Sequence, residues 1–199
     1  MSGPPAARPT SLPGRTPEEI DAGAATLVRY RGHEAAELAR VTAADVDHLR
    51  PWMPWAAATP TEEAQRAFVS TSVEEFDAGR SFNYWLREDG TAELVGGCGL
   101  HHRIGERIEI GYWVRSDRTR RGYATAAAAA LTDAAFGLPG VLRVEIHCDE
   151  ANVASAAVPR RLGYRLDRVI QDAAVEAPGE SGPEMVWVVD AGDWVTASS

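Results

Sequence analysis

A basic, glycine-containing turn that opens into an alanine-rich run is the feature that most constrains the fold. The turn is Arg118-Thr-Arg-Arg-Gly-Tyr-Ala-Thr125, and five alanines and Leu131 follow it at once. The preceding segment, Arg107–Val114, has the pattern of a strand. At a helix start, unpaired backbone N–H groups and the positive end of the helix dipole point toward one place. The sequence therefore predicts that a phosphate binds at this turn.

The charge of the whole chain makes this turn a local exception. The 199 residues suit one domain with a sizeable core, and the formal net charge is −9. That charge disfavours nucleic-acid binding, and the arginines at 115–121 form a positive island that favours a compact anion over a long polyanion. GxGxxG and P-loop signatures are absent, which disfavours a dinucleotide-dependent dehydrogenase and a nucleotide hydrolase.

The cysteines and apolar runs indicate the setting. Cys98 and Cys148 occur without a CxxC pair, so neither a disulfide framework nor a metal site is expected. Two reduced thiols favour a cytoplasmic protein. No apolar run approaches the ~20 residues that cross a bilayer, and no secretory signal is expected, so no membrane partner is predicted.

Hydrophobic patterns and turn residues divide the chain into a leader, a domain and a tail. Residues 1–17, with five prolines, are expected to be a disordered leader, residues 18–195 a domain, and residues 196–199 a tail. Strands are expected at Ala25–Tyr30, Ser81–Glu88, Ala92–His102, Arg107–Val114, Leu142–Cys148, Tyr164–Asp172 and Glu184–Val189. Helices are expected at His33–Val41, Ala43–Leu49, Pro60–Ala78, Gly122–Phe136 and Val153–Leu162, with caps at Thr42 and Thr59.

This element order indicates an α+β fold with a mainly antiparallel sheet. The unit from Ile108 to Ile146 is strand, helix and strand, and a connection of this kind places two parallel strands side by side. The parallel pair is therefore expected in the middle of the sheet.

Seven segments of the chain, in this order, resemble the GNAT superfamily of acyl-CoA-dependent N-acetyltransferases. They are Leu49–Trp55, Val95–Leu100, Ile108–Val114, Arg120–Thr125, Val144–Asp149, Asn152–Ser155 and Arg161–Tyr164. The resemblance covers Ala25 to Trp194 and is greatest to the RimJ/RimL-like branch, which acetylates amino groups including protein N-termini. It implies a single-domain GNAT fold, with a mixed, mainly antiparallel sheet and a central splayed parallel pair flanked by helices.

The resemblance also implies the donor and the residues that bind it. Acetyl-CoA is the implied co-substrate, with its pyrophosphate on backbone amides of the turn and its pantetheine arm along the strand before the turn. Thr119 stands where the family pattern has Gln or Arg, a change that leaves the backbone contacts in place. The implied donor-binding residues are Tyr112, Trp113, Val114, Arg120, Arg121, Gly122, Tyr123, Ala124, Thr125, Asn152 and Ser155. Simple packing is the alternative for Tyr112 and Trp113, and helix capping for Asn152 and Ser155.

Acetyl transfer requires a neutral amine and a protonated leaving thiol. Ser155, which the resemblance places near the sulfur, is the candidate to protonate the thiolate. Glu109 lies on the strand that carries the acetyl group and is the candidate general base, directly or through water. A merely solvated carboxylate is the alternative for Glu109, and His102 and His147 are weaker candidates.

Aromatic residues predict a wall for the acceptor amine. Trp52, Trp55 and Tyr84 are the candidates, because aromatic walls exclude water and hold small ligands; core packing is their alternative. The predicted function is transfer of an acetyl group to a primary amine, on a protein or peptide N-terminus or on a small molecule. A non-catalytic acyl-CoA-binding module on the same fold is the other hypothesis. A homodimer is compatible with the sequence and is left open.

Overall fold

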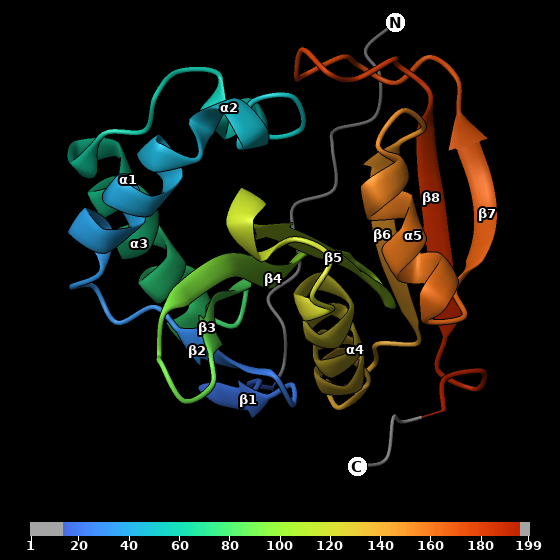
Figure 1. Cartoon of the computed structure of the whole chain (residues 1–199). Coiled ribbons are helices and arrows are strands. Elements are labelled where there is room, and N and C mark those ends of the chain that lie inside the picture. The colour runs from blue at the N-terminus through green and yellow to red at the C-terminus, as the bar shows by residue number, and fades with distance from the viewer. Residues whose placement is uncertain (1–13, 196–199) are drawn as a thin grey trace, which may run out of the picture.

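One mixed sheet organises the part of the chain, residues 14–195, that the computed structural model describes (Figure 1). Its strand order is β1-β2-β3-β4-β5-β6-β8-β7, and every neighbouring pair is antiparallel except the parallel pair β5–β6. The strands are β1 (Glu19–Asp21), β2 (Ala25–Arg29), β3 (Phe82–Glu88), β4 (Leu94–Ile104), β5 (Arg107–Val114), β6 (Arg143–Asp149), β7 (Arg165–Ile170) and β8 (Glu184–Asp190). The predicted α+β class and the parallel pair in the middle of the sheet are confirmed.

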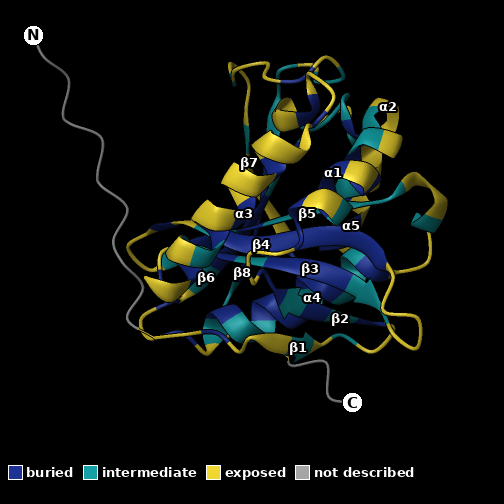
Figure 2. Ribbon diagram, turned by 90° about the vertical axis from the view of Figure 1, so that its left-hand side faces the viewer, coloured by how far each residue is buried: buried dark blue, intermediate teal, exposed yellow. Residues whose placement is uncertain are grey.

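Helices pack on both faces of this sheet. They are α1 (Ala35–Ala44), α2 (Val46–Leu49), α3 (Glu62–Asp77), α4 (Tyr123–Phe136) and α5 (Val153–Arg161), with short 3-10 turns at Pro54–Ala56 and Ser116–Arg118. Successive strand residues point to opposite faces, and β3 shows this clearly. Tyr84 belongs to the larger core cluster, which includes α4, whereas Trp85 packs with residues of α1 and α3. In Figure 2 the middle strands are largely buried between these two helical layers.

Two predicted helix boundaries are wrong for a local reason. Thr42 does not separate two helices, because its buried hydroxyl donates to the carbonyl of Leu38 (2.8 Å) and α1 runs through it. The helix predicted to start at Pro60 starts at Glu62, because the hydroxyl of Thr61, not of Thr59, accepts from the amide of Ala64.

The start of one strand differs from its predicted position, because the turn before it is longer than expected. The turn at Asp89-Gly90 continues to Ala92, which has a positive φ of 56°, so β4 begins at Leu94 rather than Ala92. Strand β1 was not predicted, because three residues carry too little periodic pattern; it pairs with β2 at the edge of the sheet.

The two ends of the chain bear on the predicted leader and tail. Residues 1–13 of the predicted leader and the predicted tail, 196–199, lie outside the described residues. Thr16, which the prediction placed in the leader, is only 5% exposed and is hydrogen-bonded to Tyr84, so the packed part begins before residue 18. None of the helices in residues 14–195 combines the length and apolar character needed to cross a membrane.

Candidate active site

The parallel strands β5 and β6 separate part of the way along their length. They pair at Arg107, Ile108 and Glu109 only, while β5 continues to Val114 and β6 to Asp149. The two strands then diverge, and the edge of β5 beyond Glu109 has no strand beside it on that side. An unpaired strand edge offers N–H and C=O groups to a ligand. The predicted splayed pair is therefore present.

The turn after β5 presents unpaired amides to solvent. Arg120 and Gly122 both have positive φ, of 60° and 89°, and Gly122 is the N-cap of α4. The first backbone N–H to close the helix is that of Ala126, which donates to the carbonyl of Gly122 (2.9 Å). Within the described residues, the amides of 120–125 donate to no acceptor. With the positive end of a 14-residue helix behind them, they have an arrangement that suits a phosphate group.

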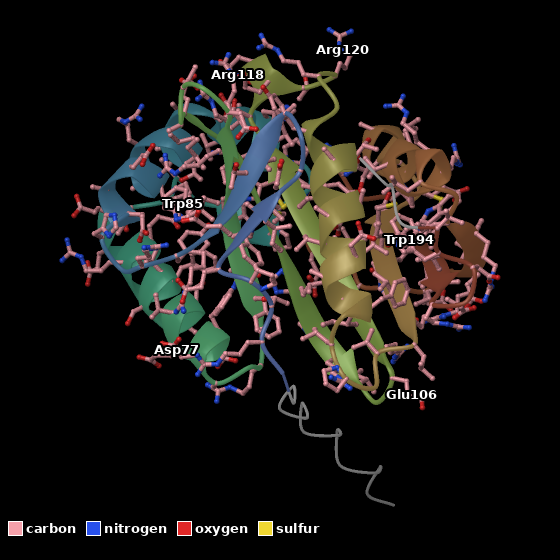
Figure 3. All side chains as sticks on the ribbon, turned by 90° about the horizontal axis from the view of Figure 1, so that it is seen from below. Asp77, Trp85, Glu106, Arg118, Arg120 and Trp194 are labelled. Carbon is pink, nitrogen blue, oxygen red and sulfur yellow. The ribbon has the colours of Figure 1, made fainter. Side chains whose placement is uncertain are left out.

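The arginines of this turn differ in whether they form ion pairs with nearby carboxylates. Arg118 is held by Glu93 and by Asp117 (3.0 Å), and Arg121 lies 3.9 Å from Glu88. Arg120 is exposed and forms no ion pair with any described residue. Figure 3 shows Arg118 and Arg120 at the same end of the molecule. Arg120 is thus the side chain of the turn most available to an anionic ligand.

A cavity of about 590 Å³ opens on the sheet face that carries α1 and α3. Its lining joins seven of the predicted site residues: Trp52, Trp55, Glu109, Tyr112, Trp113, Asn152 and Ser155. Val114 and residues 120–125 do not line it. The turn before α4 and the cavity are thus separate parts of the surface at the same pair of strands.

Two hydroxyls meet where β5 and the start of α5 face each other. The phenol oxygen of Tyr112 lies 3.2 Å from Ser155 Oγ and donates to the Ser155 carbonyl at 3.1 Å. Burial raises the pKa of Tyr112, so the phenol keeps its proton at neutral pH. Asn152 caps α5, because its Oδ1 accepts from the amide of Ser155 (3.0 Å). Asn152 therefore both caps α5 and lines the cavity.

Glu109 stands in the cavity without a hydrogen-bond partner among the described residues. Its pKa is raised above the usual value, mainly because burial disfavours the charged carboxylate, while the nearby His147 and His102 oppose this shift. A carboxylate with a raised pKa and a free oxygen is a stronger base than an ordinary carboxylate and is suited to accept a proton. His101 is not, because burial lowers its pKa to about 4.

Sequence reasoning missed an acidic group around His147. His147 Nε2 lies 3.0 Å from Glu145 Oε2, and Nδ1 lies 3.6 Å from Glu184 Oε2. Glu145 is 4% exposed, and Arg107 approaches it at 3.5 Å. The period of two along β6, which puts Glu145, His147 and Asp149 on one face, was the signal that could have found the group.

Tyr84 is the one predicted acceptor-wall residue that the structure contradicts. Its side chain is 0% exposed and points to the face of the sheet opposite the cavity. Its hydroxyl donates to the carbonyl of Pro17 (2.8 Å) and is hydrogen-bonded to Thr16 Oγ1 (2.5 Å). Alternation along β3 explains the error, since Asn83, its neighbour, lines the cavity instead.

Trp113 and Trp55 form part of an aromatic wall. Their ring centroids are 6.0 Å apart in an edge-to-face arrangement, and Trp52 lies nearby in the lining. A glycine allows this packing, because a Cβ at Gly97 would lie 2.6 Å from Nε1 of Trp113. Gly97 therefore has a packing role at the cavity.

Comparison with known proteins identifies acetyltransferases as the relatives of this chain. The family model described as the acetyltransferase (GNAT) domain matches residues 25–165, more than half of the chain. YdaF of Bacillus subtilis (strain 168), named as a candidate ribosomal N-acetyltransferase, is 36% identical over 81 residues. These are 40% of this chain and 43% of that protein, so the match spans less than half of this curated relative.

Solved structures of acetyltransferases share the fold. Mycobacterium smegmatis RimJ in complex with CoA-disulfide has a TM-score of 0.75 and 28% identity, over 92% of this chain and 88% of that one. RimL, described as a ribosomal L7/L12 alpha-N-protein acetyltransferase in complex with coenzyme A, has a TM-score of 0.79 and 20% identity, over 87% and 98%. With its splayed strands, its unpaired amides at the start of α4 and a matched domain of 141 residues between 25 and 165, this chain belongs to the GNAT family of acetyltransferases.

Proposed function

We propose that this protein transfers the acetyl group of acetyl-CoA to a primary amine by direct attack. The observation that carries the proposal is that one cavity brings an unpartnered carboxylate, Glu109, together with the hydroxyls of Tyr112 and Ser155 beside the splayed strands. These are the groups that a proton acceptor and a proton donor require. The acceptor amine belongs to a protein or peptide N-terminus or to a small molecule.

The residues of the donor side fit coenzyme A. The amides of 120–125 suit a pyrophosphate, and space around Gly122 is open, since a Cβ built there meets no atom within 4 Å. Arg120 adds an available positive charge. The unpaired edge of β5 at 112–114 suits an amide-containing arm that pairs with backbone groups. When bound, acetyl-CoA supplies the acetyl group as an activated thioester.

The residues of the cavity divide the proton transfers between them. Glu109 takes a proton from the acceptor amine, directly or through one water, and so increases the fraction of reactive neutral amine. A backbone N–H in 112–114 polarises the thioester carbonyl. Ser155 Oγ gives a proton to the departing sulfur and regains one from the nitrogen of the tetrahedral intermediate, and Tyr112 holds the Ser155 hydroxyl in place through the 3.2 Å contact. No covalent intermediate on the protein is needed.

Two measurements test this function. Calorimetry with acetyl-CoA tests donor binding, and thiol release from acetyl-CoA in the presence of a panel of primary amines tests transfer. We expect binding and amine-dependent release. A folded protein that binds acetyl-CoA but acetylates no amine in the panel would be a non-catalytic acyl-CoA-binding module, and one that does not bind at millimolar concentration would not be an acetyltransferase.

A further inference from the structure

We propose that the acceptor carries a second cationic group besides the amine that is acetylated, and that Glu184 binds this second cation. The inference rests on the proposed function and concerns the same cavity. Its class of acceptor is a diamine or a short peptide whose residue after the N-terminus is basic; both place one cation a few ångströms from a reacting amine.

The floor of the cavity is acidic. Its lining includes four carboxylates, Glu109, Asp149, Glu180 and Glu184, and no arginine or lysine from the described residues. In the sheet, Glu109 stands opposite Glu145, and Asp149 stands opposite Glu184. Like charges directly opposite each other destabilise a sheet. Arg107 and His147 contact Glu145, and backbone amides hold Asp149, so the negative charge left for a bound cation is that of Glu109 and Glu184.

The four lining carboxylates differ in what they already bind. Asp149 accepts from the backbone amides of Ala151, Ser181 and Gly182, and Glu180 accepts from those of Glu176 and Ala177. Both are therefore committed to holding their loops.

Glu109 and Glu184 remain available. Glu109 has no partner among the described residues, and Glu184 has only His147 at 3.6 Å, beyond hydrogen-bond distance. Since Glu109 is assigned to the reacting amine, Glu184 is the carboxylate left for a second cation.

A buried amide on the opposite wall is independent evidence for a polar ligand. Gln65 is 8% exposed and lines the cavity from α3, and its carboxamide has no hydrogen-bond partner among the described residues. The atoms of this carboxamide are not among the fully buried, unpaired polar atoms of the described residues, so they are accessible from the cavity and free to bind a polar group there. Trp52 and Trp55 lie in the same lining, and aromatic faces attract cations and cover methylene chains. The cavity therefore suits a ligand with polar ends and an apolar spacer.

Two available carboxylates allow a monoamine to bind in an unproductive position, and a second cation on the acceptor prevents this. A monoamine is an ammonium ion at neutral pH and can pair with either Glu109 or Glu184. A dication bound at Glu184 by one end leaves the other amine at Glu109, where proton transfer occurs. Positioning of this kind raises the rate of the chemical step as well as affinity.

Matched acceptors and a matched variant test the proposal. The diamine 1,4-diaminobutane is compared with butylamine. The tripeptide amide Ser-Arg-Ala is compared with the tripeptide amide Ser-Gln-Ala. We expect kcat/KM about tenfold higher for the dication of each pair, and Glu184→Gln to reduce this ratio to about two. Glu63→Gln is the control, because this substitution removes the same charge from an exposed side chain of α3 that does not line the cavity.

The outcomes separate this inference from the proposed function. Turnover of both members of each pair at equal kcat/KM, or equal loss of the dication preference in Glu63→Gln, would overturn the inference and leave the acetyltransferase function intact. Absence of turnover with every amine, in a protein that binds acetyl-CoA, would instead overturn the proposed function. Preference for only the diamine or only the basic peptide identifies the source of the dication. Addition of salt should reduce the preference, because an ion pair at a partly exposed carboxylate is screened.

Discussion

At the scale of single residues, Glu109 carries the proposal that the amine is deprotonated inside the cavity. The change Glu109→Gln keeps the shape of the side chain and removes the base. We expect kcat/KM to fall on the order of 100-fold or more, the range of general-base catalysis. Steady-state thiol release measures it. An unchanged rate would transfer the role to another group or to water.

The pH dependence gives a second prediction for the same carboxylate. Burial raises the pKa of Glu109, and the base works only when deprotonated. Activity should therefore fall as pH decreases through this raised pKa, above the ordinary value of 4.5. Glu109→Gln lacks the group whose titration causes this acid limb. The limb should therefore disappear from the kcat/KM profile of the variant's residual activity. An identical limb in the variant would assign it to a different group.

Ser155 and Tyr112 should act as a unit. Ser155→Ala removes the proposed proton donor, and Tyr112→Phe removes the hydroxyl 3.2 Å from it. We expect each to lower kcat about tenfold or more, and the double variant to cost clearly less than the two losses combined, because they share one interaction. Rapid-quench measurement of the chemical step checks this. Fully additive losses would show that the two hydroxyls work independently.

At the scale of elements, the turn before α4 depends on Gly122. Its φ of 89° is in the left-handed region, so Gly122→Ala should lower the free energy of unfolding by about 1 kcal/mol. It should also weaken CoA binding, because the added methyl group stands at the phosphate site. Gly163→Ala is the control, since Gly163 has a similar φ of 80° with equally open surroundings and lies at the other end of α5 from Asn152. Calorimetry and chemical denaturation together separate strain from lost binding, and equal CoA affinities in both variants would contradict the site.

The sequence was informative about elements that have strong local signals. The helix after Gly122 and strand β5 were predicted within a residue, because a glycine turn and an alternating pattern are local. The break at Thr42 was predicted wrongly, since its hydroxyl is used inside the helix, a choice that depends on burial. The site was predictable in part: Glu109 and Ser155, both singled out from the sequence, line the same cavity. The contact of His147 with Glu184 depends on the pairing of β6 with β8, and the place of Gln65 in the cavity depends on the packing of α3, and the spacing of residues along one element shows neither.

At the scale of the whole molecule, the two faces of the sheet have different tasks. One face packs Tyr84 into the core around α4, and the other forms the cavity under α1 and α3. A sequence pattern shows that Tyr84 and Trp85 alternate, but not which of them faces a helix and which a ligand. This is why Trp52 and Trp55 of the Arg50–Trp55 loop line the cavity, whereas Tyr84 of β3 does not.

Tyr84 also fixes the start of the described chain to the sheet. Its buried hydroxyl is hydrogen-bonded to Thr16 and to the carbonyl of Pro17, which lie 68 and 67 residues earlier in the sequence. Tyr84→Phe should therefore lower the free energy of unfolding by about 1 kcal/mol while leaving the KM for the acceptor unchanged. Chemical denaturation and steady-state kinetics measure the two effects. A raised acceptor KM without loss of stability would restore Tyr84 to the acceptor wall.

The most direct test of the central claim is to follow donor and acceptor in one reaction. Protein, acetyl-CoA and a diamine are mixed, and free CoA and N-acetylated diamine are quantified together by mass spectrometry. We predict that the two products appear in equal amounts, only when protein and amine are both present, and much more slowly with Glu109→Gln. Bound acetyl-CoA with no N-acetylated product from this or any other primary amine would contradict the claim.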